Sequence, residues 1–253
     1  MKPIALCLAL LATAALHATP VTIQYDGDLL PNQGAYAPVF TTIGPGGPVG
    51  YWPTTSWSSD GDILRMTTAP YSGIWFGRGT GYGDDPSFSL ANTADGNLVS
   101  AKLALGANAT DWSLYWYDAS GYGSFFSFLN NGFEYTTTAG TTFVSADMTQ
   151  FNTFTSYVLA GQVSYFFNNT YLGGGAAVTG GNNFLLIGDG SGSTPTGAGS
   201  MYLDSLKIIT AVGADAPLIA GGPAAPSVPD NGAVTLLLAG SLLGLGLVRR
   251  TQA

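Results

Sequence analysis

Hydrophobic residues in this chain occur mostly in short stretches in which they alternate with polar residues. The clearest stretch alternates Trp112, Leu114 and Trp116 with Ser113, Tyr115 and Tyr117. A period of two puts alternate side chains on opposite faces of a β-strand, so the first three are predicted to face a core. Comparable stretches predict strands over residues 21–25, 63–67, 73–77, 98–105, 125–129, 133–137, 153–159, 163–167, 184–187 and 200–209.

Turn-forming residues separate these predicted strands. The chain contains 36 glycines, and Asp95-Gly96 and Asn131-Gly132 are typical hairpin turns. Residues 36–57 are rich in proline and glycine and are predicted to be mostly loop, whereas residues 145–151 are predicted to form one helical turn. No stretch has the period of a long amphipathic helix. The pattern therefore predicts an all-β sandwich over residues 19–210.

The two ends of the chain differ from this middle part. Residues 1–18 have one basic residue, Lys2, then an apolar run and small residues, which predicts a secretory signal peptide cut after Ala18. Near the other end, residues 211–227 are small and proline-rich and predict a flexible linker. Residues 233–248 are apolar and predict a single transmembrane helix of about 24 Å. Arg249 and Arg250 follow it, which favours an outward-facing domain by the positive-inside rule.

A short motif precedes the apolar run: Val228, Pro229, Asp230, Asn231 and Gly232. Together with the apolar helix and Arg249-Arg250, this tail of residues 228–253 resembles the PEP-CTERM class of bacterial sorting tails, in a Val-Pro-Asp-Ser-Gly-type variant. Asn231 stands where that variant has serine. The resemblance implies an exosortase-type membrane protease as a partner, besides the signal peptidase. It also implies an inner-membrane-anchored intermediate on the way to the envelope, cell surface or extracellular matrix.

Several functions are excluded by composition. His17 is the only histidine and Cys7 the only cysteine, and both lie in the predicted signal peptide. The mature chain would then have no His/Cys zinc site, no Ser-His-Asp or Cys-His catalysis and no disulfide. The formal net charge is −8, which disfavours binding to the phosphate backbone of nucleic acids.

The last third of the predicted domain carries a second resemblance. Residues 157–167 predict a hairpin over Ala160-Gly161, and Met201, Leu203, Asp204, Leu206 and Ile208 lie in a closing strand. This order is similar to the closing strands of concanavalin A-like jelly rolls of the laminin-G type. The resemblance implies a jelly-roll β-sandwich, flanked here by a signal peptide and a C-terminal transmembrane helix. Its motifs are packing and turn residues, so they indicate fold more than function.

Aspartates gather on the predicted turns and give one candidate metal site. Calcium prefers oxygen ligands in glycine-rich loops, and laminin-G-like domains often carry such a site. Calcium is the single cofactor that the sequence suggests. The alternative is that these aspartates only accept hydrogen bonds from the backbone of their turns. The candidate ligands are Asp26, Asp28, Asp60, Asp62, Asp84, Asp85 and Asp189.

Aromatic residues give a candidate carbohydrate site. A loop with Trp75, Arg78, Tyr82 and Asp84 offers flat rings for the apolar face of a sugar and polar groups for its hydroxyls. The alternative is that these rings fill the sandwich core. The sequence therefore favours an exported, sorted surface or matrix protein that binds carbohydrate in extracellular polysaccharide. A structural envelope protein without a small ligand is the first alternative.

We do not expect an enzyme on these grounds. Hydrolysis of glycosides needs two carboxyl groups at a defined separation. The chain has a single glutamate, Glu134, with no second carboxylate near it on its predicted strand. A glycan-active enzyme is thus the less favoured alternative.

Overall fold

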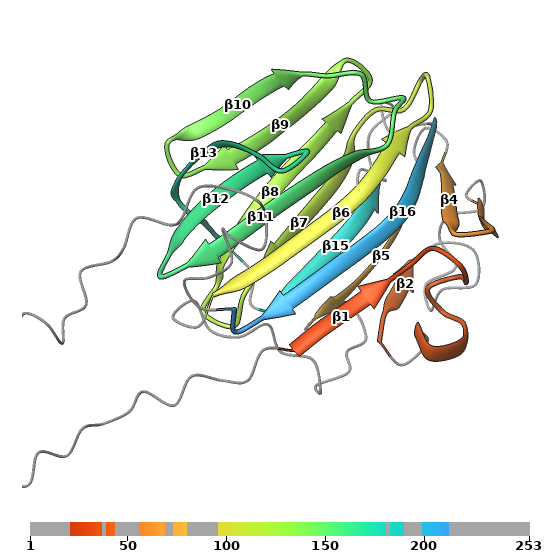
Figure 1. Cartoon of the computed structure of the whole chain (residues 1–253), viewed down its shortest axis with the longest axis horizontal. Coiled ribbons are helices and arrows are strands. Elements are labelled where there is room, and N and C mark those ends of the chain that lie inside the picture. Colours follow the sequence, from red (N-terminus) through yellow and green to blue (C-terminus); the bar gives the residue numbers. More distant parts are fainter. Residues whose placement is uncertain are drawn as a thin grey trace, which may run out of the picture.

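Two eight-stranded antiparallel sheets make up the part of the chain that is described by the computed structural model, which covers residues 21–36, 39–43, 56–68, 73–79, 96–180, 183–189 and 199–212. The two sheets lie face to face as a sandwich, with β6, β16 and β1 in front of β7, β15 and β5 in Figure 1. A single 3₁₀ turn, Gly34–Tyr36, follows the first strand. The prediction of an all-β sandwich is confirmed.

Sheet A contains the first and last described strands. Its strand order is β13 (Thr170–Ala176), β12 (Gln162–Phe167), β11 (Asn152–Leu159), β6 (Asn97–Leu105), β16 (Gly199–Thr210), β4 (Ile63–Thr68) and β3 (Ser56–Asp60), and β1 (Val21–Tyr25) also pairs with β16. In that pairing Val21 lies opposite Thr210. The first and last described strands therefore lie side by side.

Sheet B carries the aromatic strand that the sequence singled out. Its strand order is β10 (Gly140–Ser145), β9 (Gly132–Thr137), β8 (Tyr122–Leu129), β7 (Trp112–Tyr117), β15 (Phe184–Asp189), β5 (Ile74–Gly79) and β2 (Thr41–Ile43), and β14 (Val178–Thr179) also pairs with β8. Strand β7 lies between β8 and β15, near the middle of the sheet.

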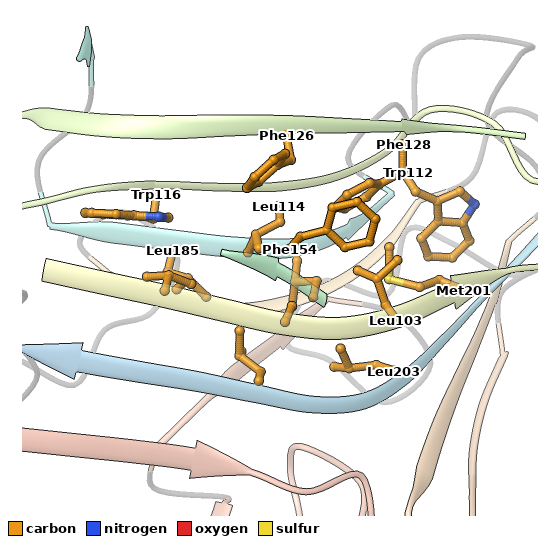
Figure 2. Close-up of a cluster of buried hydrophobic side chains, with 14 of the residues drawn as sticks. Leu103, Trp112, Leu114, Trp116, Phe126, Phe128, Phe154, Leu185, Met201 and Leu203 are labelled. Carbon is orange, nitrogen blue, oxygen red and sulfur yellow. The ribbon is translucent and has the colours of Figure 1, made fainter. Parts of the chain in front are cut away.

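The core lies between the sheets and is dominated by large rings. Trp112, Leu114 and Trp116 of β7 are fully buried there, as their alternation predicted. Figure 2 shows them facing residues of sheet A such as Leu103 and Leu203. Burial of this apolar surface is the main stabilising contribution in a domain without disulfides.

A chain of hydrogen bonds crosses this apolar core between the sheets. Ser156 of β11 accepts hydrogen bonds from the Trp116 indole Nε1 at 2.9 Å and from the Ser124 hydroxyl at 2.7 Å. Tyr165 of β12 donates its hydroxyl to the Thr136 carbonyl at 2.5 Å and accepts the Phe125 backbone N–H at 3.2 Å. The buried polar groups of both sheets thereby find partners in each other, which fixes the register of one sheet over the other.

Two sequence-based expectations differ from the structure. Residues 145–151 form no helical turn, because Asp147 Oδ1 accepts the Thr149 backbone N–H and holds a short non-helical turn. Of residues 36–57, predicted to be mostly loop, the described part includes the short strand β2 and the start of β3. Strands β10 and β13 were not predicted as strands, because they are rich in threonine and glycine rather than in alternating apolar residues.

The predicted signal peptide, residues 213–227 of the predicted linker 211–227, the motif 228–232 and the apolar run 233–248 lie outside the described residues. Within the described ranges, no helix is long and apolar enough to cross a membrane.

Candidate functional site

A second aromatic cluster lies on the face of sheet B that points away from the core. We call it the outer aromatic cluster. Tyr115 contacts Phe125 and Phe184, with ring centroids 5.6 and 5.1 Å apart. The cluster forms because β7 alternates, so that its tyrosines face outward while its tryptophans face the core. Its members are Trp75 of β5, Tyr115 and Tyr117 of β7, Phe125 of β8, and Phe184 and Leu186 of β15.

The cluster is not uniformly accessible. Trp75 is 8% exposed and Phe184 is 7% exposed, so both are enclosed. Tyr115, Tyr117 and Phe125 are half-buried and keep part of their rings accessible. The accessible side of the cluster therefore lies over β7 and β8, rather than at Trp75.

A polar row runs beside the cluster on the same outer face. Backbone register aligns Trp75 with Gly188, Gly188 with Ser113, Ser113 with Ser127, and Ser127 with Glu134. At about 4.8 Å per strand, the row from Trp75 to Glu134 spans about 19 Å. Ser113 is buried, and its hydroxyl donates to the Gly188 carbonyl at 3.4 Å. The half-buried Ser127 hydroxyl and Glu134 carboxylate lie within reach of the same extended ligand as the accessible rings.

Glu134 holds a distinctive position in this row. It is the only glutamate in the chain and is half-buried on β9. Among the described residues it is the only carboxylate at an outward-facing position of sheet B. The alternation of Glu134 with the buried Phe133 and Tyr135 is the sequence signal that places it on the outer face.

Of the four residues predicted to form the carbohydrate loop, the structure places Trp75 on the outer face, against Phe184 and Leu186. Arg78 lies on β5 with its backbone opposite Leu185, and its side chain is outside the described part. Tyr82 and Asp84 also lie outside the described residues. The sequence alone did not place Trp75 on one face with Tyr115, Ser127 and Glu134. Strand order and register set that arrangement, and they cannot be read from local sequence patterns.

Two aspartate turns predicted as calcium ligands meet in space. The Ser59 hydroxyl donates to the Gly27 carbonyl at 2.7 Å, which joins the turn of Asp26 and Asp28 to that of Asp60 and Asp62. A Cβ atom on Gly27, which has φ +76°, would lie 2.5 Å from the Asp62 carbonyl oxygen. Only glycine permits this close approach of the two turns.

The side chains of Asp26 and Asp28 already have partners. Gln24 donates to Asp26 Oδ1 at 2.6 Å, and the Tyr36 hydroxyl donates to Asp28 Oδ1 at 2.9 Å. Burial and this hydrogen bond raise the pKa of the Tyr36 hydroxyl. Asp189 is fully buried on β15, and Asp84 and Asp85 lie outside the described part. The described residues contain no group of three or more His, Cys, Asp or Glu placed to hold a metal ion.

Asp118 is a buried carboxylate at the end of β7, next to Tyr117. Its Oδ1 accepts the backbone N–H groups of Ser120 and Tyr122 at 2.8 and 3.1 Å, which closes the turn into β8. Its Oδ2 is buried without a hydrogen-bond partner. Burial raises the pKa of this carboxyl above the ordinary 3.8, and the backbone donors of the turn oppose that rise.

No family model matches the chain, and no curated protein matches it in sequence. Solved structures with a similar fold include the transglycosylase Crh5, which is 13% identical over 79% of this chain and 88% of its own, with a TM-score of 0.50. A β-glucanase from Bacillus licheniformis is 10% identical over 74% and 97%, with a TM-score of 0.48. The alginate lyase AlgAT5 of polysaccharide lyase family 7 is 11% identical over 67% and 93%, with a TM-score of 0.47.

These neighbours are carbohydrate-active jelly-roll proteins, and at this identity the likeness to Crh5 shows the fold. They correct one expectation. The prediction that the protein is not an enzyme is wrong, because it took one missing carboxylate pair as a sign of the whole class. Crh5, a solved protein with this fold, is a transglycosylase.

Proposed function

We propose that the protein is exported to the cell envelope or extracellular matrix and engages polysaccharide through the outer face of sheet B. The observation that carries this proposal is the juxtaposition of accessible rings with a polar row on one face. Tyr115 and Phe125 offer flat rings for the C–H face of a sugar, and Ser127 and Glu134 offer groups for its hydroxyls. The carbohydrate chemistry of the structural neighbours supports the same substrate class.

Export and sorting belong to this proposal on the strength of the sequence. Residues 1–18 would direct secretion through signal peptidase, and the tail from Val228 to Arg250 would hold the chain in the inner membrane. An exosortase-type protease would then process the tail. The absence of histidine and cysteine after residue 17 is compatible with a protein that works outside the cytoplasm without disulfides.

The test is polysaccharide retention by the full-length protein, with Tyr115→Leu and Phe125→Leu as variants. Leucine keeps an apolar side chain but removes the flat ring, so we expect retention to fall while the unfolding temperature changes little. Tyr171→Leu is the matched control, because Tyr171 is an aromatic residue that is 44% exposed on the edge strand of sheet A. Unchanged retention in both variants would remove the outer aromatic cluster as the site. Parallel measurements with calcium and with a chelator test the aspartate turns.

A second candidate function is a glycan-active enzyme. Glu134 favours it, because this half-buried carboxylate shares the outer face with the accessible rings. Its partner carboxyl would have to come from elsewhere in the chain. We expect Glu134→Gln to abolish release of new reducing or unsaturated sugar ends while leaving polysaccharide retention intact. Equal release by both proteins would exclude Glu134 as the catalytic carboxylate.

A further inference from the structure

The open edges of the two sheets are not equally protected. An open edge presents unpaired N–H and C=O groups that can pair with another strand, and most edges carry some obstacle to this. Strands β2 and β14 have only three and two residues. The pairing of strand β13 with β12 contains a register shift, and β13 includes three consecutive glycines, Gly173 to Gly175. Strands β1 and β3 run directly into the aspartate turns.

Strand β10 has none of these obstacles. It has six residues in unbroken register with β9 and contains no charge, no proline and no bulge. Five of its residues are exposed, and Phe143 is 46% exposed. A regular, uncharged edge strand with an exposed ring is the kind of edge that natural sheets usually cover or pair.

The hairpin between β9 and β10 fixes which backbone groups face outward. Thr137 and Gly140 flank a two-residue loop, and such flanking residues form a hydrogen-bonded pair. Hydrogen bonding then alternates along the strand, so Gly140, Thr142 and Val144 bond to β9. Thr141, Phe143 and Ser145 direct their N–H and C=O groups to the open edge.

We propose that β10 is a self-association edge, where two copies of this chain pair antiparallel about a two-fold axis at Phe143. This register places Phe143 opposite itself and Thr141 opposite Ser145 of the second copy, and all of these residues have outward-facing backbone groups. Because the axis is perpendicular to the sheet, the outer face of one copy continues into the outer face of the other. The two eight-stranded sheets B become one continuous sheet.

A second copy fits this edge in pattern and in charge. The cross-strand pairs would be Phe-Phe, Thr-Val and Thr-Ser, which join aromatic, β-branched and hydroxyl side chains without opposing like charges. Within the described strands of sheet B, the nearest carboxylates are the two Glu134 side chains, each one strand further in. Three strand spacings separate them by about 14 Å. That exceeds the Debye length of about 8 Å at physiological ionic strength, so the acidic chains do not repel strongly at this edge.

The pairing extends the polar row across the interface, because Glu134 lies opposite Phe143 on β10. If the outer face binds polysaccharide as proposed above, two such faces would point in the same direction. A polymer chain could then engage both copies, with the gain in retention that bivalence provides. The self-association itself does not depend on that function.

Cross-linking of the full-length chain, expressed with its own signal and tail, tests the interface. A Cys7→Ser background removes the only native cysteine, and Phe143→Cys then introduces a single reporter at the two-fold axis. A short bis-maleimide should join two copies through residue 143. Tyr171→Cys is the matched control, since Tyr171 is 44% exposed on a different edge. A mixture of T141C and S145C chains gives the same test if F143C protein is not recovered.

Charge variants test the register. In the Phe143→Cys reporter protein, the additional substitutions T141K/S145K place lysines opposite each other across the axis. The yield of cross-linked dimer should fall about fivefold, because like charges directly opposite each other destabilise strand pairing. T141K/S145E places opposite charges there and should restore it. Three results would each overturn the proposal. Residues 143 and 171 could cross-link equally, residue 143 could cross-link to other proteins instead of to a second copy, or the T141K/S145E pair could fail to restore the dimer.

Discussion

At the scale of single residues, Tyr165 occupies a place where two strands of the opposite sheet separate. The pairing of β8 with β9 ends at Phe126 and Tyr135. One step further, the Tyr165 hydroxyl inserts between the Phe125 N–H and the Thr136 carbonyl and bonds to both. Burial raises the pKa of this hydroxyl to about 12, so it stays protonated and keeps its donor at any physiological pH.

We expect Tyr165→Phe to destabilise the domain by about 1–3 kcal/mol, because the Phe125 N–H and the Thr136 carbonyl would both lose their buried partner. Urea unfolding of the variant and the parent measures this difference. Tyr171→Phe is the control, because Tyr171 is exposed and should be nearly neutral. Equal stability of the two variants would mean that water replaces the hydroxyl.

Asp118 gives a prediction for the dependence of stability on pH. Its pKa is raised in the folded state, so the folded protein holds the proton more tightly than the unfolded chain. The stabilising contribution is complete below the ordinary pKa of 3.8 and is lost as pH rises through the folded value. Asp118→Asn keeps an oxygen acceptor for Ser120 and Tyr122 but carries no charge.

The free energy of unfolding of the parent, taken relative to Asp118→Asn, should therefore fall as the pH rises above the ordinary pKa of 3.8. Urea titrations at several pH values in this range measure it. Asp147→Asn is a useful comparison, because hydrogen bonds from Thr149 lower the pKa of that exposed carboxyl. Its stabilising contribution is present above the ordinary 3.8 and is lost as the pH falls below it, which is the opposite sign. A difference that is constant with pH would show that Asp118 titrates alike in both states.

At the scale of elements, strand β15 packs closely against its neighbour β5 at a single glycine, Gly188. Gly188 has φ +143°, and a Cβ atom there would lie 2.3 Å from the Ile74 carbonyl oxygen and 2.6 Å from Trp75 Cβ. The missing side chain lets β5 and its tryptophan approach β15 closely.

Gly188→Ala should destabilise the domain by about 2–4 kcal/mol or prevent folding, since it adds a backbone clash to an unfavourable φ. Gly140→Ala is the matched control: it has φ +135° and nothing within 4 Å of the added Cβ. Chemical denaturation should show a clearly smaller loss for Gly140→Ala. Similar losses for both would assign the cost to φ alone.

The sequence predicted the strands that bury one face and failed for those that do not. Strand β7 was predicted with its faces because its tryptophans alternate with smaller polar and aromatic residues. Strand β10 is exposed on both faces, so burial imposes no period of two on it. The candidate site was predicted only at Trp75. The placement of Trp75, Tyr115 and Glu134 on one face depends on strand order and register across five strands, which local patterns do not encode.

At the scale of the whole molecule, the proposed export and sorting give a prediction for the ends of the mature protein. We expect mass spectrometry of the mature protein to find an N-terminus at Thr19 and a C-terminus that lacks Arg249 and Arg250, because signal peptidase and an exosortase-type protease would remove both ends. Inactivating the protease should leave the full tail in place. A mature protein that retains Arg250 in wild-type cells would leave the tail as a plain anchor.

Strand β16 also has a mechanical consequence. It is the last described strand, and it is bonded to β6 on one side and to β4 and β1 on the other. If the proposed membrane tether follows Val212, tension from it would pull along the axis of this strand. The ladder bonds on both sides lie across that axis and would be loaded together in shear, instead of breaking one after another as in a peeled edge strand. A domain held in this way would resist flow and the drag of a captured polymer without unravelling from its tethered end.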